Sequence, residues 1–424
     1  MNHAIFGWQQ GWRYGLMGLA LAFVALPLYV MLPHFYAERF GVPLATLGAL
    51  LLGARLLDAF IDPLLGRWSD RLHAHAPQQV LPWAAVAAVL LALGFALLFL
   101  PPSLSPHDLL LWAAMGLALT YGGYSALSIL HQSWGARLGG DEIQRARVVA
   151  WREGLGLLGV VLACVAPLLL GMAATSALFT LALALGWYAW SQAPRPPTPA
   201  RPLDFAQAAS PALSLWLPFR RPQFRALLAV FILNGVASAV PATLLLFYVQ
   251  DRLQAPASWQ PLFLGSYFLA AAASIPLWLR LVARMGLARS WAIGMLLAIA
   301  VFLLAVPLGA GDAPAFVLVC LGSGLALGTD LALPAALLAG TIAAQGDRGL
   351  AEGAYFGWWN FATKLNLALA AGIALPALGW LGYTPGTVDS AALQTLTFAY
   401  CLLPCGLKLL AALLLYFLII RKLP

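Results

Sequence analysis

Apolar residues fall in a series of long runs along this chain, and short polar or basic segments separate the runs. Most runs reach the roughly 20 residues that a helix needs to cross the hydrocarbon layer of a bilayer. They lack the strict alternation of apolar and polar positions that marks the strands of a membrane barrel. The pattern therefore predicts about twelve membrane-spanning helices. Their expected ranges are 14–36, 42–66, 80–101, 108–135, 148–170, 173–192, 223–250, 261–281, 290–310, 314–343, 353–382 and 393–420.

The longest polar segment divides these runs into two groups of six. Residues 193–222 carry several prolines with arginines between them, a composition that is typical of an extended linker. We therefore expect an N-terminal six-helix half at 1–192, a linker at 193–222 and a C-terminal six-helix half at 223–424.

Composition and charge agree with an integral membrane protein. The chain is 62% hydrophobic and 9% charged, whereas a soluble domain carries about 25% charged residues. Basic residues concentrate in alternate loops, which places both termini in the cytoplasm and the chain in the cell (inner) membrane as a multi-pass protein. The net charge of +8 is spread singly over these loops, so nucleic-acid binding is not expected.

The second apolar run contains three ionisable residues, Arg55, Asp58 and Asp62. Each costs about 2.5–3.5 kcal/mol at the centre of a membrane helix, and such residues usually mark a functional site. Asp58 and Asp62 are four residues apart, so both carboxylates share one helix face. This spacing predicts a cation or proton site. The alternative is a structural salt-bridge cluster with Arg55.

Further charged residues lie at membrane depth in the second half of the chain. Asp330 stands beside Pro334, which interrupts its helix pattern, and Lys364 lies in the eleventh run. With Arg55, Asp58 and Asp62 they sum to a charge of −1, which one bound cation would neutralise. Lys408, in the last run, could snorkel or pair, and its role stays open.

Several motifs carry a resemblance to known transporters. Gly66-Arg-Trp-Ser-Asp-Arg71 resembles the loop motif of the major facilitator superfamily. Arg55-x-x-Asp58-Ala-x-x-Asp62-Pro63-x-x-Gly66 is more specific and resembles the second-helix signature of the glycoside–pentoside–hexuronide:cation symporters. Three other stretches resemble the same family, namely 119–125, 145–154 and 353–383.

The resemblance implies an all-α integral membrane fold with twelve transmembrane helices in two six-helix pseudo-symmetric halves. It implies a secondary active transporter that carries a small organic solute, such as a sugar or glycoside, by alternating access with a coupling ion, H⁺ or Na⁺. No other cofactor, and no metal site, is expected. Asp58 and Asp62, with Arg55, match the residues that bind the coupling cation.

A substrate cavity is expected near the membrane midplane, between the two repeats. Its predicted lining combines residues at membrane depth with residues of the stretches that resemble the family, namely Lys364, Asp330, Arg152, Tyr121, Ser125, Trp358, Trp359 and Asn360. Alternatives stay open for several of them. Arg152 could instead pair with Glu153, Asp330 could pair with Lys364, and the tryptophans could anchor the interface.

Departures from the family pattern bear on the ion and the substrate. Sodium-coupled members carry an amide one residue before the second acid, where this chain has Ile61, and an ungapped alignment places Gly122 at the position of a hydroxyl. Two missing oxygens favour H⁺ over Na⁺. The acids that grip a galactoside align near Ala22 and Ser125, so those particular sugar contacts are not reproduced.

Charged residues at the predicted cytoplasmic ends of the helices suggest a conformational latch. We expect Asp70 and Arg71, with Arg145 and Arg147, to form pairs that break as the two halves rock. The alternative is a solvated loop.

Two other functions are kept open. The second-helix acids and Lys364 also resemble sodium-coupled lysophospholipid transporters, so the cargo could be a lysolipid or another amphiphile. A non-transporting sensor or a membrane enzyme is the remote alternative. The chain shows neither a phosphate-binding Gly-rich loop nor a catalytic cluster, so no enzyme activity is expected. The expected partners are a small-molecule or amphiphile substrate and the lipid bilayer, and the protein is expected to be a monomer.

Overall fold

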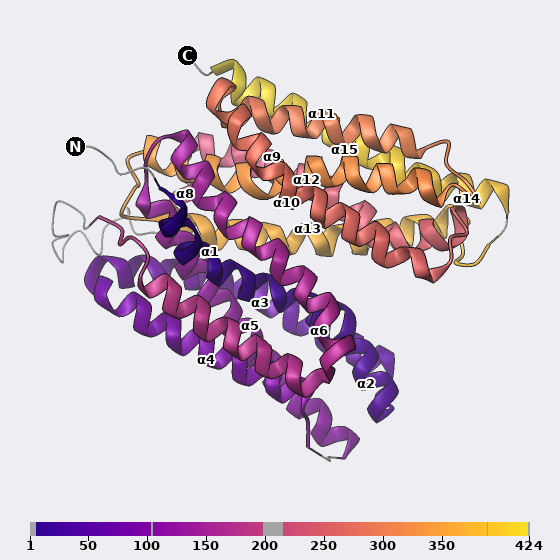
Figure 1. Ribbon diagram of the computed structural model, residues 1–424, viewed down its shortest axis with the longest axis horizontal. Helices are drawn as coiled ribbons and strands as arrows, with labels where there is room; N and C mark the ends of the chain where they lie inside the picture. The colour runs from indigo at the N-terminus through magenta and orange to yellow at the C-terminus, as the bar shows by residue number, and fades with distance from the viewer. Residues whose placement is uncertain (1–5, 103–104, 198–214, 388, 423–424) are drawn as a thin grey trace. The chain divides into compact units, whose positions relative to one another are not determined.

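The computed structural model describes residues 6–102, 105–197, 215–387 and 389–422. These residues are almost entirely helical and include no β-strand (Figure 1). Within them, nine helices are long and apolar enough to cross a membrane. The expectation of an all-helical membrane protein is confirmed.

The chain divides into two compact units. Unit 1 comprises Met1–Arg220 and Ala339–Phe361, and unit 2 comprises Arg221–Leu338 and Ala362–Pro424. The end of α12 and the beginning of α13 therefore belong to unit 1. The central part of the predicted linker, 198–214, lies outside the described residues, so the boundaries 193–222 stay a prediction.

Unit 1 contains the helices of the first half of the sequence. They are α1 (Trp8–Phe23), a π-helical segment (Pro27–Met31), α2 (Leu32–Phe40), α3 (Leu44–His75), α4 (Val80–Phe99), α5 (Pro106–Leu138), α6 (Glu142–Ser191) and the short α8 (Leu217–Arg220).

Unit 2 contains the helices of the second half, except for the end of α12 and the beginning of α13. They are α9 (Pro222–Phe247), α10 (Gln260–Met285), α11 (Leu287–Ala305), α12 (Ala313–Ala344), α13 (Glu352–Trp380), α14 (Ser390–Thr397) and α15 (Leu403–Leu418). π-helical segments, Tyr248–Arg252 and Phe398–Leu402, continue α9 and join α14 to α15.

These helices account for the twelve predicted spans. The nine candidates are fewer than twelve because α6 contains two predicted spans, and because 8–40 and α3 are not counted among the nine. α6 breaks at Gly171, where φ is 75° and ψ is 169°. Glycine adopts this positive φ at little steric cost. The sequence-based gap between 148–170 and 173–192 falls at this residue and is confirmed.

Glycine also permits a close helix crossing in unit 1, that of α1 with α6. A Cβ atom added at Gly159 would lie 2.1 Å from the carbonyl oxygen of Leu19, and one added at Gly18 would lie 2.4 Å from the carbonyl oxygen of Arg152. Small residues let membrane helices approach this closely and gain packing contacts. The crossing fixes the position of the α6 segment that carries Arg152.

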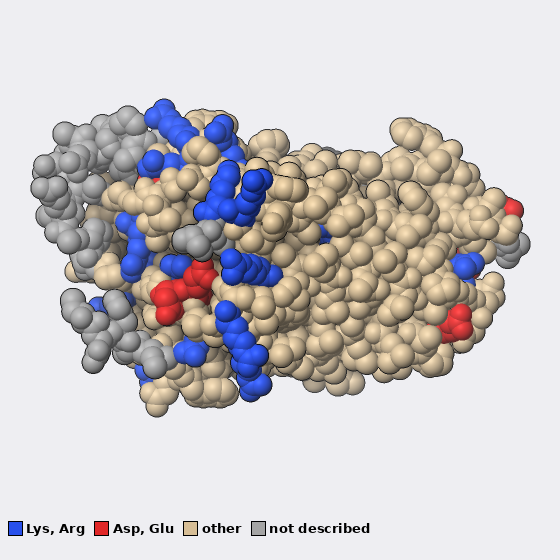
Figure 2. Space-filling model, turned by 90° about the horizontal axis from the view of Figure 1, so that it is seen from above, with Lys and Arg blue, Asp and Glu red and all other residues tan. Residues whose placement is uncertain are grey.

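Large apolar side chains remain on the outside of the molecule. Leu168 and Trp380, for example, are 82% and 88% exposed. The face in Figure 2 accordingly carries a broad surface of uncharged residues, with charged side chains gathered in separate groups. A lipid-facing surface needs such residues, because hydrocarbon does not solvate charge.

Candidate coupling and substrate sites

The two acids of the second-helix motif lie on α3 and are buried. Asp58 is 4% exposed and Asp62 is fully buried. The hydroxyl of Ser125, on α5, donates a hydrogen bond of 2.6 Å to Asp58 Oδ1. The Asp58 carboxylate and the Ser125 hydroxyl meet where α3 packs against α5, and Asp62 lies one turn further along α3. Oxygen ligands of this kind suit a small hard cation, and a carboxylate also accepts a proton.

The Ser125 contact adds an oxygen beside the acids. The ungapped alignment put Gly122 at the position of the hydroxyl and Ser125 in the predicted substrate cavity, and the structure shows the Ser125 hydroxyl donating to Asp58. Gly122 and Ser125 are three residues apart on α5 and share a helix face. Ile61, 43% exposed, offers no oxygen.

The first residues of α13 pack directly over this part of α3. A Cβ atom added at Gly357 would lie 2.6 Å from the carbonyl oxygen of Asp62. One turn along α3, a Cβ added at Gly66 would lie 2.1 Å from the carbonyl oxygen of Gly353. Only glycine fits at such distances, because the obstructing atoms are backbone. The glycines bring α13 into contact with α3 beside Asp62.

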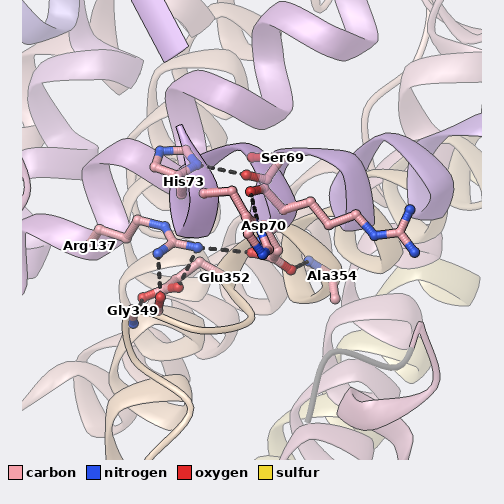
Figure 3. A network of polar contacts seen from close by, with 10 residues as sticks. Ser69, Asp70, His73, Arg137, Gly349, Glu352 and Ala354 are labelled. Carbon is pink, nitrogen blue, oxygen red and sulfur yellow. Dashed lines mark hydrogen bonds and ion pairs between the residues drawn. The ribbon is translucent and has the colours of Figure 1, made fainter. Parts of the chain in front are cut away.

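A buried ion-pair network lies next to this crossing (Figure 3). Asp70 accepts hydrogen bonds of 2.7 Å from the backbone N–H groups of Gly353 and Ala354, at the beginning of α13. Arg137, at the end of α5, contacts Asp70 at 2.9 Å and Glu352 at 3.0 Å. Arg137 also donates to the carbonyl oxygen of Gly349 at 2.7 Å. The network joins α3, α5 and α13 through one arginine between two carboxylates.

The electrostatics of this network depend on burial. Desolvation raises the pKa of Asp70 to about 7, and Glu352 adds to that rise, while Arg137 and the two N–H donors oppose it. Burial, helped by the charge of Arg137, lowers the pKa of His73 to about 3. His73 is therefore neutral at physiological pH, and its Nδ1 bonds to the carbonyl oxygen of Ser69 at 2.9 Å. Asp70 is the group that titrates near neutrality.

Asp62 and the network share one face of α3. Asp62, Gly66 and Asp70 follow one another at intervals of four residues, which places them in a row along the helix. In the same order they meet Gly357, Gly353 and the N–H groups that begin α13. Asp62 therefore lies two helical turns from Asp70, and both belong to the same packed contact between α3 and α13.

The predicted latch residues lie in different surroundings. Arg71 is exposed, and Arg147 is partly buried. Arg145 donates to the carbonyl oxygen of Gly140 at 2.9 Å. Arg137, which the sequence analysis did not single out, takes the position beside Asp70. A basic residue at the end of the fourth predicted span and an acid before the eleventh were the available signals for Arg137 and Glu352.

Arg152 follows the alternative that the sequence left open. Its Nη2 lies 2.5 Å from Glu153 Oε1, and its Nε donates to the same oxygen at 2.8 Å. Nearby, Tyr14 and His131 stack with ring centroids 4.2 Å apart. The Tyr14 hydroxyl donates to the carbonyl oxygen of His131 at 2.9 Å. Tyr14 and His131 thus hold α1 against α5.

The predicted aromatic lining of α13 divides between two environments. Trp358 donates its indole N–H to the carbonyl oxygen of Leu215 at 2.9 Å and packs on Trp216. This places Trp358 at the end of the linker. Trp359 is buried, Asn360 and Lys364 are partly buried, and Tyr121 is buried on α5.

Asp330 lies in a second polar cluster, within unit 2. Lys408, on α15, contacts Asp330 Oδ2 at 2.8 Å and donates to Asn234 Oδ1 at 2.8 Å. Asp330 also accepts hydrogen bonds from Asn234, Ser238 and Trp291 at 3.0, 3.2 and 2.9 Å. Lys408 is therefore the cation that pairs with Asp330. The sequence had left the role of Lys408 open and had offered Lys364 as a possible partner of Asp330.

The fold is similar to that of solved transporter structures. A bacterial homologue of the iron transporter ferroportin, solved in an outward-facing state, superimposes with a TM-score of 0.68 at 18% sequence identity, over 97% of this chain and 98% of that one. At such identity the similarity concerns the fold alone.

Sequence comparison narrows this class. Residues 13–422 match the family described as MFS/sugar transport protein, and the chain belongs to that family. Its relatives include the inner membrane symporter YicJ of Escherichia coli, 29% identical over 155 residues, and the isoprimeverose transporter of Lactiplantibacillus pentosus, 30% identical over 158 residues. The matches cover 37% and 36% of this chain but only 33% and 32% of those proteins. The family that the second-helix motif indicated is thereby confirmed.

Proposed function

We propose that this protein is a secondary active transporter that couples the movement of a cation to the symport of a sugar or glycoside. The names of its relatives, a symporter and an isoprimeverose transporter, support this class of substrate. We place it in the inner membrane with both termini in the cytoplasm, in accord with the distribution of basic loops. A transport role, rather than an enzymatic one, is what the family supports.

The buried acid pair on α3 carries the proposal. Ionisable residues inside a membrane protein are costly and mark ion or proton pathways. Asp58 and Asp62 meet this description, and the Ser125 hydroxyl fixes the Asp58 carboxylate in place. In our scheme the two acids hold the coupling ion. Arg55, one turn before Asp58, tunes their charge.

We further propose that the ion is a proton. A carboxylate alone can bind a proton, whereas a sodium ion needs several oxygen ligands. Ser125 supplies one oxygen besides the carboxylates, but the position before Asp62 is the apolar Ile61. Burial and a neighbouring like charge both favour uptake of a proton by one acid of such a pair.

The Asp70–Arg137–Glu352 network is proposed to close the transporter in one of its states. It is buried and joins α3 and α5 to the beginning of α13 through charge-assisted hydrogen bonds, which are about twice as strong as neutral ones. Such a network favours one of two discrete arrangements, as alternating access requires. In our scheme, binding of the coupling ion at Asp62 affects this network through the packed contact of Gly66 with Gly353.

The test is transport in proteoliposomes by Asp62→Asn, which keeps the size of the side chain but removes its ionisable group. Uptake of labelled sugars and glycosides against a concentration gradient, driven by an imposed pH gradient or sodium gradient, should fall at least about tenfold. Exchange of internal for external substrate, which needs no net cation movement, should be less affected.

Asp141→Asn is the matched control. Asp141 caps α6 by accepting a hydrogen bond from the Gln144 N–H, and Asn caps helices about as well as Asp. This variant should transport like the unmodified protein. Uphill uptake that survives in Asp62→Asn at the level of Asp141→Asn would contradict the coupling role. Stimulation by sodium and not by a pH gradient would contradict the choice of the proton.

A further inference from the structure

Unit 2 contains a cavity that adjoins the Asp330–Lys408 pair. Its volume is about 180 Å³, and it is lined by residues of α9, α10, α11, α12 and α15 together with Tyr400 of the π-helical segment. Most of its wall is aromatic or aliphatic, and Phe263, Phe302, Phe316 and Tyr267 contribute rings. Asp330, Lys408 and Ser238 form its polar end.

The size of the cavity limits the occupant. An engineered protein cavity of about 150 Å³ lined by apolar side chains binds benzene. A cavity of about 180 Å³ therefore has room for one aromatic ring or a short alkyl group. Ligand sites commonly combine such an apolar lining with a few fixed polar groups.

The polar end limits the chemistry beside that group. The Asp330 carboxylate accepts four hydrogen bonds, from Asn234, Trp291, Ser238 and Lys408, which match its roughly four lone-pair positions. The Lys408 ammonium has three N–H donors, of which two point to Asp330 Oδ2 and Asn234 Oδ1. The third can donate to an uncharged oxygen, while the Ser238 hydroxyl, which donates to Asp330 Oδ2, can accept a hydrogen bond from a hydroxyl group.

Charge balance points the same way. Asp330 and Lys408 neutralise each other at 2.8 Å, so an anionic group would be attracted by one and repelled by the other. A neutral ether or hydroxyl oxygen leaves the pair intact. An apolar ring next to such oxygens is the arrangement at the anomeric end of an aryl glycoside.

We propose that this cavity binds the apolar aglycone of a neutral glycoside, with Lys408 and Ser238 contacting the oxygens beside it. The inference rests on the proposed function, since it names the class of glycoside that the transporter prefers. It predicts preference for phenyl or short-alkyl glycosides over the methyl glycosides of the same sugars.

Cys320 provides a readout that does not depend on transport. It lines the cavity, whereas Cys164, Cys401 and Cys405 do not contribute to it. Replacing these three with Ala leaves Cys320 as the single thiol, whose alkylation by N-ethylmaleimide is followed by mass spectrometry. The probes are phenyl and methyl β-glycosides of glucose, galactose and xylose, and lysophosphatidylcholine.

Occupancy of the cavity should slow alkylation by mass action. For the accepted sugar, the phenyl glycoside should protect Cys320 at a concentration about ten- to a hundredfold lower than the methyl glycoside, because only the phenyl ring buries apolar surface. Equal protection by both members of every pair would overturn the proposal. So would stronger protection by lysophosphatidylcholine.

Ser323 allows a matched pair of variants. It lines the cavity, and its hydroxyl bonds only to carbonyl oxygens of its own helix, at Val319 and Cys320. Ser323→Phe should fill the cavity and abolish protection by the phenyl glycoside, while Ser323→Ala should preserve it. Should Ser323→Phe misfold, Ala298→Phe fills the cavity from α11. Protection that persists in a folded filled variant would overturn the proposal.

Ligand-induced stabilisation gives a second measurement on the same proteins. The phenyl glycoside should raise the melting temperature more than the methyl glycoside does, except in the filled variant. Coupled uptake of sugars with no phenyl preference in either measurement would remove this inference and leave the proposed function intact. Phenyl-dependent protection without cation-coupled uptake would contradict the proposed function and leave the cavity as a binding site for phenyl glycosides.

Discussion

Replacing Arg137 with Gln should shift the equilibrium between the closed and the open Asp70–Arg137–Glu352 network about a hundredfold towards the open form, in which α13 separates from α3. Arg137 is 5% exposed and lies between Asp70 and Glu352, each 1% exposed. Without it, two carboxylates remain buried next to each other with no cation between them in the network (Figure 3). The Gly349 carbonyl loses a donor as well.

The magnitude follows from these contacts. Removing one partner of a buried ion pair costs about 3–5 kcal/mol. The introduced amide side chain can still donate one neutral hydrogen bond, worth about 1 kcal/mol. A net loss of about 3 kcal/mol corresponds to about a hundredfold change in the equilibrium between the closed and open network, since each 1.4 kcal/mol is tenfold.

The assay reports the opening of the network through a buried thiol. Ser69 is fully buried beside Asp70, and Ser69→Cys in a protein whose four native cysteines are replaced by Ala changes little volume. Maleimide should modify this introduced thiol about a hundredfold faster when Arg137→Gln is added. Arg71→Gln, an exposed arginine on the same helix, is the matched control and should leave the rate within about twofold.

The pH dependence gives a second check. Burial raises the pKa of Asp70 to about 7 in the closed network, whereas the exposed carboxyl of an open network should return towards the ordinary value of about 3.9. At pH values between these two pKa values, the closed network binds more protons than the open one. Acidification from about pH 8 to about pH 6 should therefore favour the closed network. The alkylation rate of the introduced thiol, divided by that of the same thiol in denatured protein, should fall. Equal rates in Arg137→Gln and Arg71→Gln, or a corrected rate that rises on acidification, would refute the reasoning.

Two further substitutions test the packing around the candidate sites. Gly357→Ala would place a methyl group 2.6 Å from the Asp62 carbonyl oxygen and should cost about 1–3 kcal/mol, seen as faster alkylation of the thiol introduced by Ser69→Cys. Gly372→Ala, on the same helix with open space around it, should not accelerate it. Lys408→Met should lower the melting temperature by leaving Asp330 without its cation, a loss of about 3–5 kcal/mol. Adding Asp330→Asn should restore most of that loss, and a melting temperature unchanged by Lys408→Met would contradict the assigned pair.

Hydropathy was sufficient to predict the helices, because length and apolar content are properties of single segments. The predicted break after residue 170 coincides with Gly171, whose positive φ interrupts α6. The buried acids of α3 were also predictable, since Asp58 and Asp62 lie within one apolar run at helical spacing.

Partners between distant segments were harder to predict. Arg137 lies 67 residues from Asp70, and several loop arginines, among them Arg71, offered equally good sequence candidates. Likewise, Lys364 and Lys408 were both plausible partners for Asp330, and only the folded structure shows that Lys408, on α15, reaches Asp330, on α12. The hydrogen bond from Ser125 to Asp58 also joins residues 67 positions apart, and the sequence alone does not reveal it.

Substrate-induced proton movement tests the central claim most directly. When a transported glycoside is added to lightly buffered, energy-depleted cells that contain the protein, protons should enter with it, and the medium should become transiently alkaline. Asp62→Asn should abolish this signal, and Asp141→Asn should preserve it. Glycoside entry without any alkalinisation in the unmodified protein, or an undiminished signal in Asp62→Asn, would contradict proton symport through the acids of α3.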